Sequence, residues 1–339
     1  MNHHTVVGID LAKHVFQVAI FERAKIVSNR RYSRSELTEF LINSKPSKVF
    51  MEACYSAHYW GRLAERHGHT VGLIPAQHVK PFTRGNKNDA NDAVAIVEAS
   101  SRPNLRLVNV KSLDKQDIQS LHRMRERLVR NRTGLINQTH GLLAEYGLLL
   151  GARKKAFIQG VTQALNNEHL SPLIKEQLRF NLDELEHTTA RIKSIEAELA
   201  KFVRQDTSAN ILQSIPGIGL LNASGLAAKY GDPNQFANAR ELAVHLGLTP
   251  RQVASGHRQQ MLGISKRGDR YLRKQLIHGA RALLARAPKH PNDALCQWAV
   301  RLKDRRGHNV AVTALARKLA PLAWTLLHKQ EIYQSQTIH

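Results

Sequence analysis

The chain has 339 residues, of which 42% are hydrophobic and 23% charged, as is usual for folded globular proteins. Its 50 Lys and Arg residues against 27 Asp and Glu give a formal net charge of +23, which favours a polyanionic partner such as nucleic acid. The two cysteines, Cys54 and Cys296, exclude a disulfide scaffold and a zinc site built from cysteine. The length predicts two or three domains, since one domain usually takes roughly 100–200 residues.

The first part of the chain, residues 1–112, alternates strand-like and helix-like segments. Three apolar stretches at its start predict a meander, and the alternation after them predicts further strands with helices on the faces of the sheet. The predicted strands are residues 4–10, 15–21, 25–32, 48–53 and 70–75, and the predicted helices are residues 35–44, 57–67 and 88–101. We therefore expect an α/β domain with a mixed sheet.

The middle part, residues 113–205, is predicted to consist of long helices. Leucines recur every seven residues at Leu121, Leu128, Leu135 and Leu142, and a second apolar stripe occupies residues 178–202. Such stripes suit a coiled coil that joins two chains and equally suit two helices of an ordinary bundle. Between the stripes, helix-breaking residues are Gly147, Gly151, Gly160 and Pro172.

The last part, residues 206–330, is predicted to be mostly helical. The expected helices are residues 237–248, 270–286, 293–303 and 309–328. Residues 249–266 are polar without a clear period and are predicted to form a loop, and residues 329–339 carry no signal. We find no apolar run approaching about 18 residues and no signal peptide, so we expect a cytoplasmic protein without a membrane span.

Four carboxylates occupy unusual places in the first part. Asp10 ends one apolar strand and Glu52 lies in another, where an uncompensated charge is costly. Asp89 and Asp92 share one face of a predicted helix and repel each other unless a cation lies between them. Taken singly, these two are also explained by the helix dipole, which favours acids in a first turn. Together the four predict a site for Mg²⁺ or Mn²⁺, which prefer oxygen ligands.

Three segments are candidates for binding nucleic-acid phosphates: residues 215–219 and two basic clusters at residues 264–274 and 121–132. Residues 215–219, Ile-Pro-Gly-Ile-Gly, resemble the turn of helix-hairpin-helix modules, where small residues let backbone N–H groups approach phosphates. The alternative for residues 215–219 is a plain turn between packed helices. The alternative for the basic clusters is a solvated surface without a partner. The predicted contacts are Pro216, Gly217, Gly219, Lys266, Arg267, Arg270, Arg273, Lys274, Arg123 and Arg127. Contacts of this kind bind without reading sequence, and such binding weakens steeply with salt.

The carboxylates carry a specific resemblance to a known family. Asp10 in GIDLAK, Glu52 in MEACYSAHYW, and Asp89 and Asp92 in NKNDANDA resemble the Asp-Glu-Asp-Asp tetrad of insertion-sequence family 110 transposases. Those enzymes resemble the site-specific enzyme that inverts pilin genes. The resemblance implies a ribonuclease-H-like first domain, similar to RuvC resolvases, followed by a helical linker and a C-terminal transposase domain.

A serine in the last part carries the second half of the resemblance. From composition alone, Ser255-Gly256 is a turn. Its spacing from Pro250, and the basic stretch ISKRGDRYLR that follows, resemble the C-terminal domain of the same family. The resemblance implies that Ser255 is the nucleophile that attacks a DNA phosphate, and Ser265 is the nearest other candidate.

The resemblance implies a DNA transposase or recombinase whose carboxylates and serine form one composite site. It also implies that the two halves come from different subunits of a dimer or tetramer, and that a structured RNA encoded by the element pairs with donor and target DNA. Two alternatives remain open: a RuvC-like nuclease that uses water, and a basic architectural protein whose carboxylates are structural. A trapped covalent protein–DNA adduct would separate the transposase from both.

Overall fold

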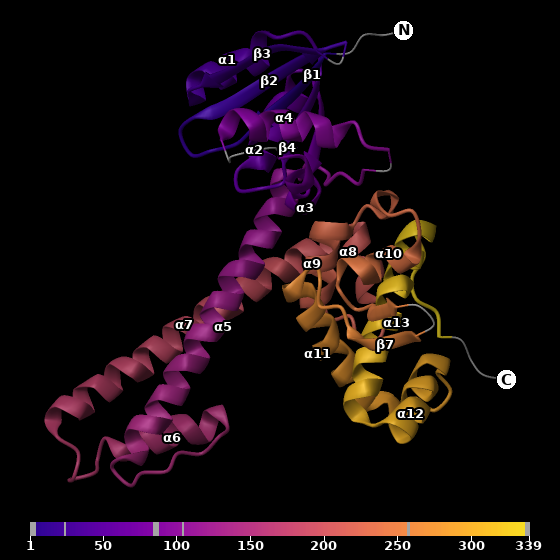
Figure 1. Cartoon of the computed structure of the whole chain (residues 1–339). Coiled ribbons are helices and arrows are strands. Elements are labelled where there is room, and N and C mark those ends of the chain that lie inside the picture. The colour runs from indigo at the N-terminus through magenta and orange to yellow at the C-terminus, as the bar shows by residue number, and fades with distance from the viewer. Residues whose placement is uncertain (1–4, 24, 84–87, 104, 256–257, 336–339) are drawn as a thin grey trace. The chain divides into compact units, whose positions relative to one another are not determined.

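The computed structural model describes residues 5–23, 25–83, 88–103, 105–255 and 258–335 (Figure 1). The chain divides into two compact units, Met1–Leu113 and Asp114–His339. The middle and last parts distinguished in the sequence share the second unit, and a boundary between them at residue 205 stays a prediction.

The first unit contains a five-stranded mixed sheet in the order β3-β2-β1-β4-β5. An antiparallel meander is formed by β1 (Val6–Asp10), β2 (Phe16–Glu22) and β3 (Lys25–Tyr32). On the other side of β1, β4 (Lys48–Glu52) pairs parallel with it, and β5 (Thr70–Ile74) pairs parallel with β4. The predicted mixed sheet, with its meander at the start of the chain, is confirmed.

Helices cover both faces of this sheet. The core on one face includes side chains of α1 (Arg34–Asn43) and α2 (Ala57–Arg66), while α4 (Asp89–Ser100) packs on the other face. Gly8 of β1 lies under α4, and a Cβ there would be 2.5 Å from the carbonyl oxygen of Ala93. The missing side chain therefore lets α4 lie close to the strand. Two short helices, α3 (Ala76–Val79) and η1 (Lys80–Phe82), follow β5.

Local signals explain where the helices begin. Before α1, the Ser33 hydroxyl accepts the N–H of Glu36, and the Glu36 carboxylate accepts the N–H of Ser33, which is a capping box. In α7 (Pro172–Gln205), Ser171 is the N-cap and Pro172 is the first helical residue. Pro172 was expected to break a helix, but proline is favoured at the first position, where its missing N–H has no partner to lose.

In the second unit, α5 (Leu113–Ala144) and α7 run side by side in opposite directions (Figure 1). Their contacts bring Ile118 into one cluster with Leu199, pair Arg125 with Glu196, and join Thr139 to Asn181. The two predicted apolar stripes thus meet within one chain, as in a helical bundle. Whether the same helices also join subunits stays a prediction.

One helix between them was not predicted. α6 (Lys154–Ala164) lies in the segment whose glycines suggested irregular structure. Phe157 and Val161 of this helix are buried in a cluster with Leu143 of α5. A Cβ at Gly160 would lie 2.8 Å from the Leu150 side chain, so this glycine permits close packing instead of ending a helix.

The remainder of the second unit is mostly helical, as predicted. It comprises α8 (Thr207–Gln213), α9 (Leu220–Tyr230), η2 (Pro233–Gln235), α10 (Ala239–His245), α11 (Arg270–Arg286), η3 (Ala287–Lys289), α12 (Ala294–Arg306) and α13 (His308–Lys329). Among the described residues, α13 is the one helix long and apolar enough to cross a membrane by length and composition. Leu315 and Leu319 are fully buried in the core of this unit, so α13 serves as a core helix.

A correction concerns residues 249–266, which were expected to form a loop. Most of them belong to a two-stranded antiparallel ribbon of β6 (Pro250–Ser255) and β7 (Arg258–Ile264). Val253 is 52% exposed and Met261 65% exposed, one on each strand. Alternation of apolar and polar residues appears when one face of a sheet is buried, and these exposed strands therefore leave no such period.

Candidate active site and nucleic-acid interface

Two of the four predicted carboxylates end neighbouring strands. β1 and β4 are parallel, and Ile9 pairs with Met51 in their register. The next residue on each strand is a carboxylate, Asp10 on β1 and Glu52 on β4, and both side chains are partly exposed. Parallel pairing thus places Asp10 and Glu52 at the same end of the sheet, on adjacent strands.

The pKa of the Cys54 thiol is affected by the negative charges at this edge of the sheet. Burial raises the pKa of Cys54 to about 11, with further contributions from the negative charges of Glu52 and Asp10. Both carboxylates are therefore near enough to act on the same thiol. A cysteine with so high a pKa is almost entirely protonated at neutral pH, so it is not a nucleophile here.

The other two carboxylates lie in the first turn of α4. Asn88 caps this helix by accepting the N–H of Asn91 at 2.8 Å, and Asp89 and Asp92 follow it. The close contact between Gly8 and Ala93, the residue after Asp92, fixes this end of α4 over β1.

A chain of side-chain amides also joins α4 to the sheet. Gln17 of β2 lies opposite Asp10 in the register, and its Nε2 donates to Oδ1 of Asn29 at 2.6 Å. Asn29 Nδ2 in turn donates to the carbonyl oxygen of Ala90 at 3.1 Å. The neighbour of Asp10 is thereby linked to the first turn of α4. Gln17 is only 5% exposed, so this link is part of the interior.

The donor set fits a divalent cation by its chemistry, because carboxylate oxygens are the ligands that Mg²⁺ and Mn²⁺ prefer. The strand register brings Asp10 and Glu52 together, and α4 brings Asp89 and Asp92 together. Within the described residues, no three His, Cys, Asp or Glu side chains gather as a metal-binding group. The convergence of all four carboxylates on an ion stays a prediction.

Ser255, the predicted nucleophile, is the last residue of β6, and its backbone pairs with Arg258 across the ribbon. Gly256 and His257, which join the strands, lie outside the described residues. Ser265 instead lies at the base of the ribbon, where its N–H donates to the carbonyl of Thr249 at 2.7 Å. The two candidate serines are therefore at opposite ends of the ribbon.

The base of the ribbon is held by closely packed backbone. Gly247 has a φ of +65° and Gly268 a φ of +115°, both in the region that favours glycine. A Cβ at Gly247 would lie 2.2 Å from the Arg267 carbonyl oxygen, and one at Gly268 would lie 2.1 Å from that of His245. The two ends of the exposed ribbon that lie next to the start of α11 are therefore joined to tightly packed backbone.

The predicted phosphate-binding turn joins α8 to α9, and its resemblance to a helix-hairpin-helix module stays a prediction. Ile215 and Ile218 are buried, and Gly217 has a φ of +87°. Gly219 is the N-cap of α9 and provides no side-chain cap, and a Cβ there would meet nothing within 4 Å. An uncapped, accessible helix N-terminus is a favourable position for an anion, since its backbone N–H groups need partners.

Similarity to known proteins shows the family to which the chain belongs. A model described as a transposase matches residues 7–148, and the model of the transposase IS116/IS110/IS902 family matches residues 209–306. The transposase for insertion sequence element IS1111A of Coxiella burnetii is 43% identical over 332 residues, which cover 97% of this chain and 91% of the relative. The transposase for element IS1328 of Yersinia enterocolitica is 36% identical and covers 98% of this chain and 99% of the relative.

The chain belongs to the IS116/IS110/IS902 family of transposases. It is therefore an enzyme that cleaves and joins DNA, and the architectural alternative is wrong. The pilin gene-inverting protein of Moraxella bovis is also similar, at 22% identity over 98% of each chain. The expected resemblance to both groups is thus confirmed.

The basic residues of the transposase fall into two groups. Two of the predicted phosphate contacts have partners within the protein: Arg273 donates to the Leu246 carbonyl at 2.9 Å, and Lys274 forms an ion pair with Glu126 at 2.6 Å. The side chains that face solvent are Lys266, Arg267, Arg270, Arg123 and Arg127. Among the predicted phosphate contacts, these five are exposed and have no ion pair or side-chain hydrogen bond described within the protein.

Sequence reasoning missed a buried polar cluster in the second unit of the transposase. His122 of α5 is 3% exposed, and its ring contacts the Tyr271 hydroxyl at 2.7 Å and the Ser224 hydroxyl at 3.0 Å. Ser224 donates its own proton to the Leu220 carbonyl, so His122 Nε2 carries a proton and Nδ1 accepts from Tyr271. The cluster ties α5 to α9 and α11. A lone histidine in a helix gives no sequence signal for such a role.

Proposed function

We propose that this transposase exchanges DNA strands through attack by the Ser255 hydroxyl, assisted by a divalent ion bound to Asp10, Glu52, Asp89 and Asp92. The observation that carries the proposal is the position of Asp10 and Glu52, which directly follow the paired residues Ile9 and Met51 at the same end of two parallel strands. Both the carboxylates and the serine lie in segments that the transposase family models match. The name of the pilin gene-inverting relative supports site-specific recombination of this kind.

In the cleavage step, the Ser255 oxygen forms a bond to a DNA phosphorus while the bond from that phosphorus to one deoxyribose oxygen breaks. The departing oxygen gains a proton, and the serine loses one. In the joining step, a free DNA hydroxyl attacks the phosphoserine, and Ser255 leaves with its proton restored. Each step replaces one phosphodiester by another, so the bond energy is conserved and no ATP is needed. Covalent catalysis of this kind requires an activated hydroxyl.

A bound divalent ion supplies Lewis acidity that lowers the pKa of an attacking hydroxyl and stabilises charge on a leaving oxygen. We infer that the ion is Mg²⁺ or Mn²⁺ from the all-oxygen donors. The protein's own part is to hold those donors on β1, β4 and α4 while Cys54 stays protonated and chemically inactive. The meander followed by parallel strands supports assigning this unit to the ribonuclease-H-like class, which includes RuvC resolvases.

Covalent trapping tests the serine mechanism. Wild-type protein incubated with labelled DNA and Mg²⁺ should give an adduct that survives denaturing electrophoresis, and Ser255→Ala should give none. Ser265→Ala is the matched control, since it removes a serine at the opposite end of the same ribbon, and it should retain the adduct. Metal-dependent cleavage without an adduct would instead establish the water-using nuclease.

A mixing experiment tests whether the site is composite. We propose a dimer or tetramer in which one subunit supplies the carboxylates and another the serine. Asp10→Asn and Ser255→Ala proteins should each be inactive alone and should recover part of the activity when mixed. If light scattering shows oligomers yet the mixture stays inactive, each site is built within a single chain.

We also propose that an RNA encoded by the element selects the DNA sites, and that the protein works with its DNA in the cytoplasm. The net charge of +23 and the accessible turn at residues 215–219 support binding of nucleic acid by its phosphates, which carry no sequence information. Protein purified from cells should retain RNA from the ends of the element. Site-specific exchange that persists after complete RNase digestion would contradict this proposal.

A further inference from the structure

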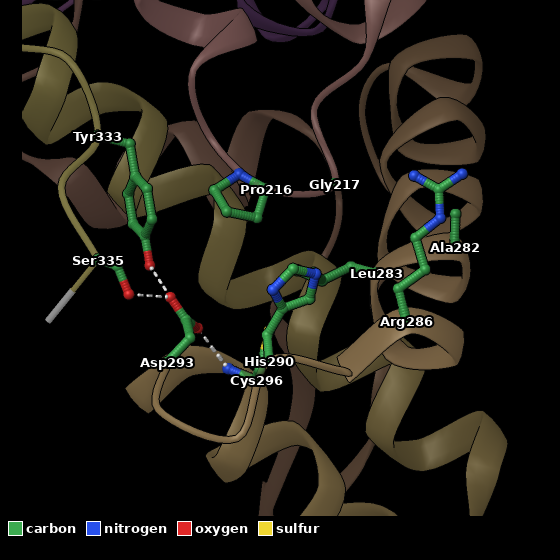
Figure 2. A pocket seen from close by; sticks show the side chains of 10 residues that line it. All are labelled: Pro216, Gly217, Ala282, Leu283, Arg286, His290, Asp293, Cys296, Tyr333 and Ser335. Carbon is green, nitrogen blue, oxygen red and sulfur yellow. Dashed lines mark hydrogen bonds between the residues drawn. The ribbon is translucent and has the colours of Figure 1, made fainter. Parts of the chain in front are cut away.

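A pocket of about 450 Å³ lies where the turn at residues 215–219 meets the end of α11 and the start of α12 (Figure 2). This volume is within the range of pockets that hold small organic ligands, roughly 300–1000 Å³. The C-terminal segment, for which the sequence gave no expectation, contributes Tyr333 and Ser335 to its wall. The pocket is distinct from the carboxylates and from Ser255.

The pocket has two unlike sides. Figure 2 shows Tyr333, Ser335 and Asp293 on one side and Arg286 on the other, with Pro216 and His290 between them. The Tyr333 and Pro216 rings offer apolar surfaces, and the opposite side carries cationic or proton-accepting groups. A matching ligand therefore combines an apolar, flat part with an anionic part.

The Asp293 carboxylate is already engaged. Its Oδ1 accepts the N–H of Cys296 at 2.8 Å, and its Oδ2 accepts from Tyr333 at 3.0 Å and from Ser335 at 2.7 Å. Burial alone would raise the pKa of Asp293, but these hydrogen bonds lower it overall, so the group stays ionised. Asp293 thus acts as an anchor for the pocket wall.

The side chains of Arg286 and His290 are not engaged in this way. Both are exposed, and no hydrogen bond or ion pair of either side chain is found within the described residues. Arginine matches phosphate oxygens through its planar fork of N–H donors. The side of the pocket with Arg286 and His290 is therefore the side that can bind a phosphate.

The opposite wall is fixed before any ligand arrives. The Tyr333 backbone N–H donates to the Ser214 hydroxyl at 2.8 Å, while its phenol is held by Asp293. The ring also packs against the main core of the second unit. An aromatic surface that is already ordered binds a planar group with little further loss of entropy.

We propose that this pocket holds one unpaired nucleotide of the nucleic acid on which the transposase acts. Its phosphate lies beside Arg286 and His290, and its base lies against Pro216 and Tyr333. A paired base inside a duplex exposes no face for such stacking, whereas a base in a single strand does. The nucleotide can come from a DNA strand or from an RNA, and the site serves either a serine or a water mechanism.

Binding by matched variants tests the site. Arg286→Ala removes the pocket arginine, and Arg281→Ala removes an exposed arginine of the same helix that does not line the pocket. The probes are fluorescent oligo(dT) and oligo(U) of about ten nucleotides, within the range of single-strand sites, and a blunt DNA duplex. Arg286→Ala should weaken binding to at least one single strand by about tenfold more than Arg281→Ala, because it loses charge-assisted hydrogen bonds. Both variants should change duplex binding equally.

Equal losses on the single strands for the two variants would overturn the proposal. If oligo(dT) and oligo(U) differ in their loss, the larger effect identifies which strand supplies the nucleotide. A second measurement locates the base directly: an oligonucleotide carrying 5-iodouracil, irradiated in the complex, should crosslink to the peptide that contains Tyr333. Crosslinks confined to peptides outside the pocket would also overturn the site. Neither measurement depends on the nucleophile, so failure here leaves the serine mechanism intact.

Discussion

The two parts of the proposed active site differ in how tightly the surrounding structure packs around them. The carboxylates lie at the ends of buried strands and in a capped helix, where a Cβ at Gly8 has no room. Ser255 ends a ribbon with exposed side chains, and a Cβ at Gly263 in that ribbon would meet nothing within 4 Å. A metal site depends on fixed distances between its ligands, whereas a nucleophile that must reach a separate DNA strand can tolerate movement. The contrast predicts which changes alter chemistry and which alter stability.

The largest effect should follow from removing one carboxylate of the sheet. Asp10→Asn should lower strand exchange by about 10³-fold or more, since it removes a charge on which the reaction depends. The fold should be retained, because Asn is close to Asp in size and the Asp10 side chain is partly exposed. Asp304→Asn, an exposed change on α12, is the control and should keep full activity. Near-normal exchange by Asp10→Asn would remove this residue from the proposed site.

The second effect concerns the buried His122, which joins α5 to α9 and α11 in the second unit. Burial first, and the Arg125 charge second, lower the pKa of His122 to about 4, below its usual value of 6.5. The unfolded chain therefore binds more protons between these pH values, so the contribution of His122 to stability is complete above pH 6.5 and is lost as pH falls toward 4. The expected loss is roughly 3 kcal/mol.

Thermal unfolding measured across this pH range checks the assignment. The wild-type midpoint should fall steeply with acidification, and His122→Gln should show a shallower slope from a lower starting stability. Identical slopes for the two proteins would show that another group governs the acid sensitivity of this unit.

The third effect compares two glycines directly. Gly8→Ala should destabilise the first unit by about 1–3 kcal/mol, because α4 or the strand must shift. Gly263→Ala should change the free energy of unfolding by no more than about 0.5 kcal/mol, since space is open around it. Chemical denaturation of both variants measures the difference, and equal losses would contradict the contrast between sheet and ribbon.

The smallest effect separates an accessible charge from a structural one. Arg267→Ala should lower the salt dependence of DNA binding by about one charge and leave stability unchanged. Arg273→Ala should reduce stability by about 1 kcal/mol, because its guanidinium hydrogen bonds to Leu246. Binding titrations at several salt concentrations and thermal melts measure the two quantities. A reversed pattern would mean that Arg273 is the phosphate contact.

Much of the first unit could be predicted, because most of its strands contain buried apolar runs and because α1 and α4 begin at capping residues. The placement of Asp10 and Glu52 at strand ends followed from the apolar runs before them. The ribbon around Ser255 could not be predicted, since exposed strands show no alternation of polarity. α11 was predicted with its observed bounds, because its apolar residues recur at helical spacing.

Other parts of the sites depend on long-range contacts that sequence patterns do not record. His122 and Tyr271 are 149 positions apart, and their contact exists only after α5 and α11 pack. Tyr333 and Ser335 lie in a segment without any pattern, yet both hold Asp293. The apolar stripes of α5 and α7 were recognisable, but only the structure shows that they contact each other within the chain.

The pairing of α5 with α7 has a consequence for synthesis of the protein. Ile118 leaves the ribosome before Leu199, its partner in the same cluster, has been made. At about 5–20 residues per second, the apolar stripe of α5 waits for several seconds without its partner. During that interval the nascent chain presents a helix face suited to chaperones or to another nascent copy. Translation that stops before α7 would therefore release a fragment prone to aggregation.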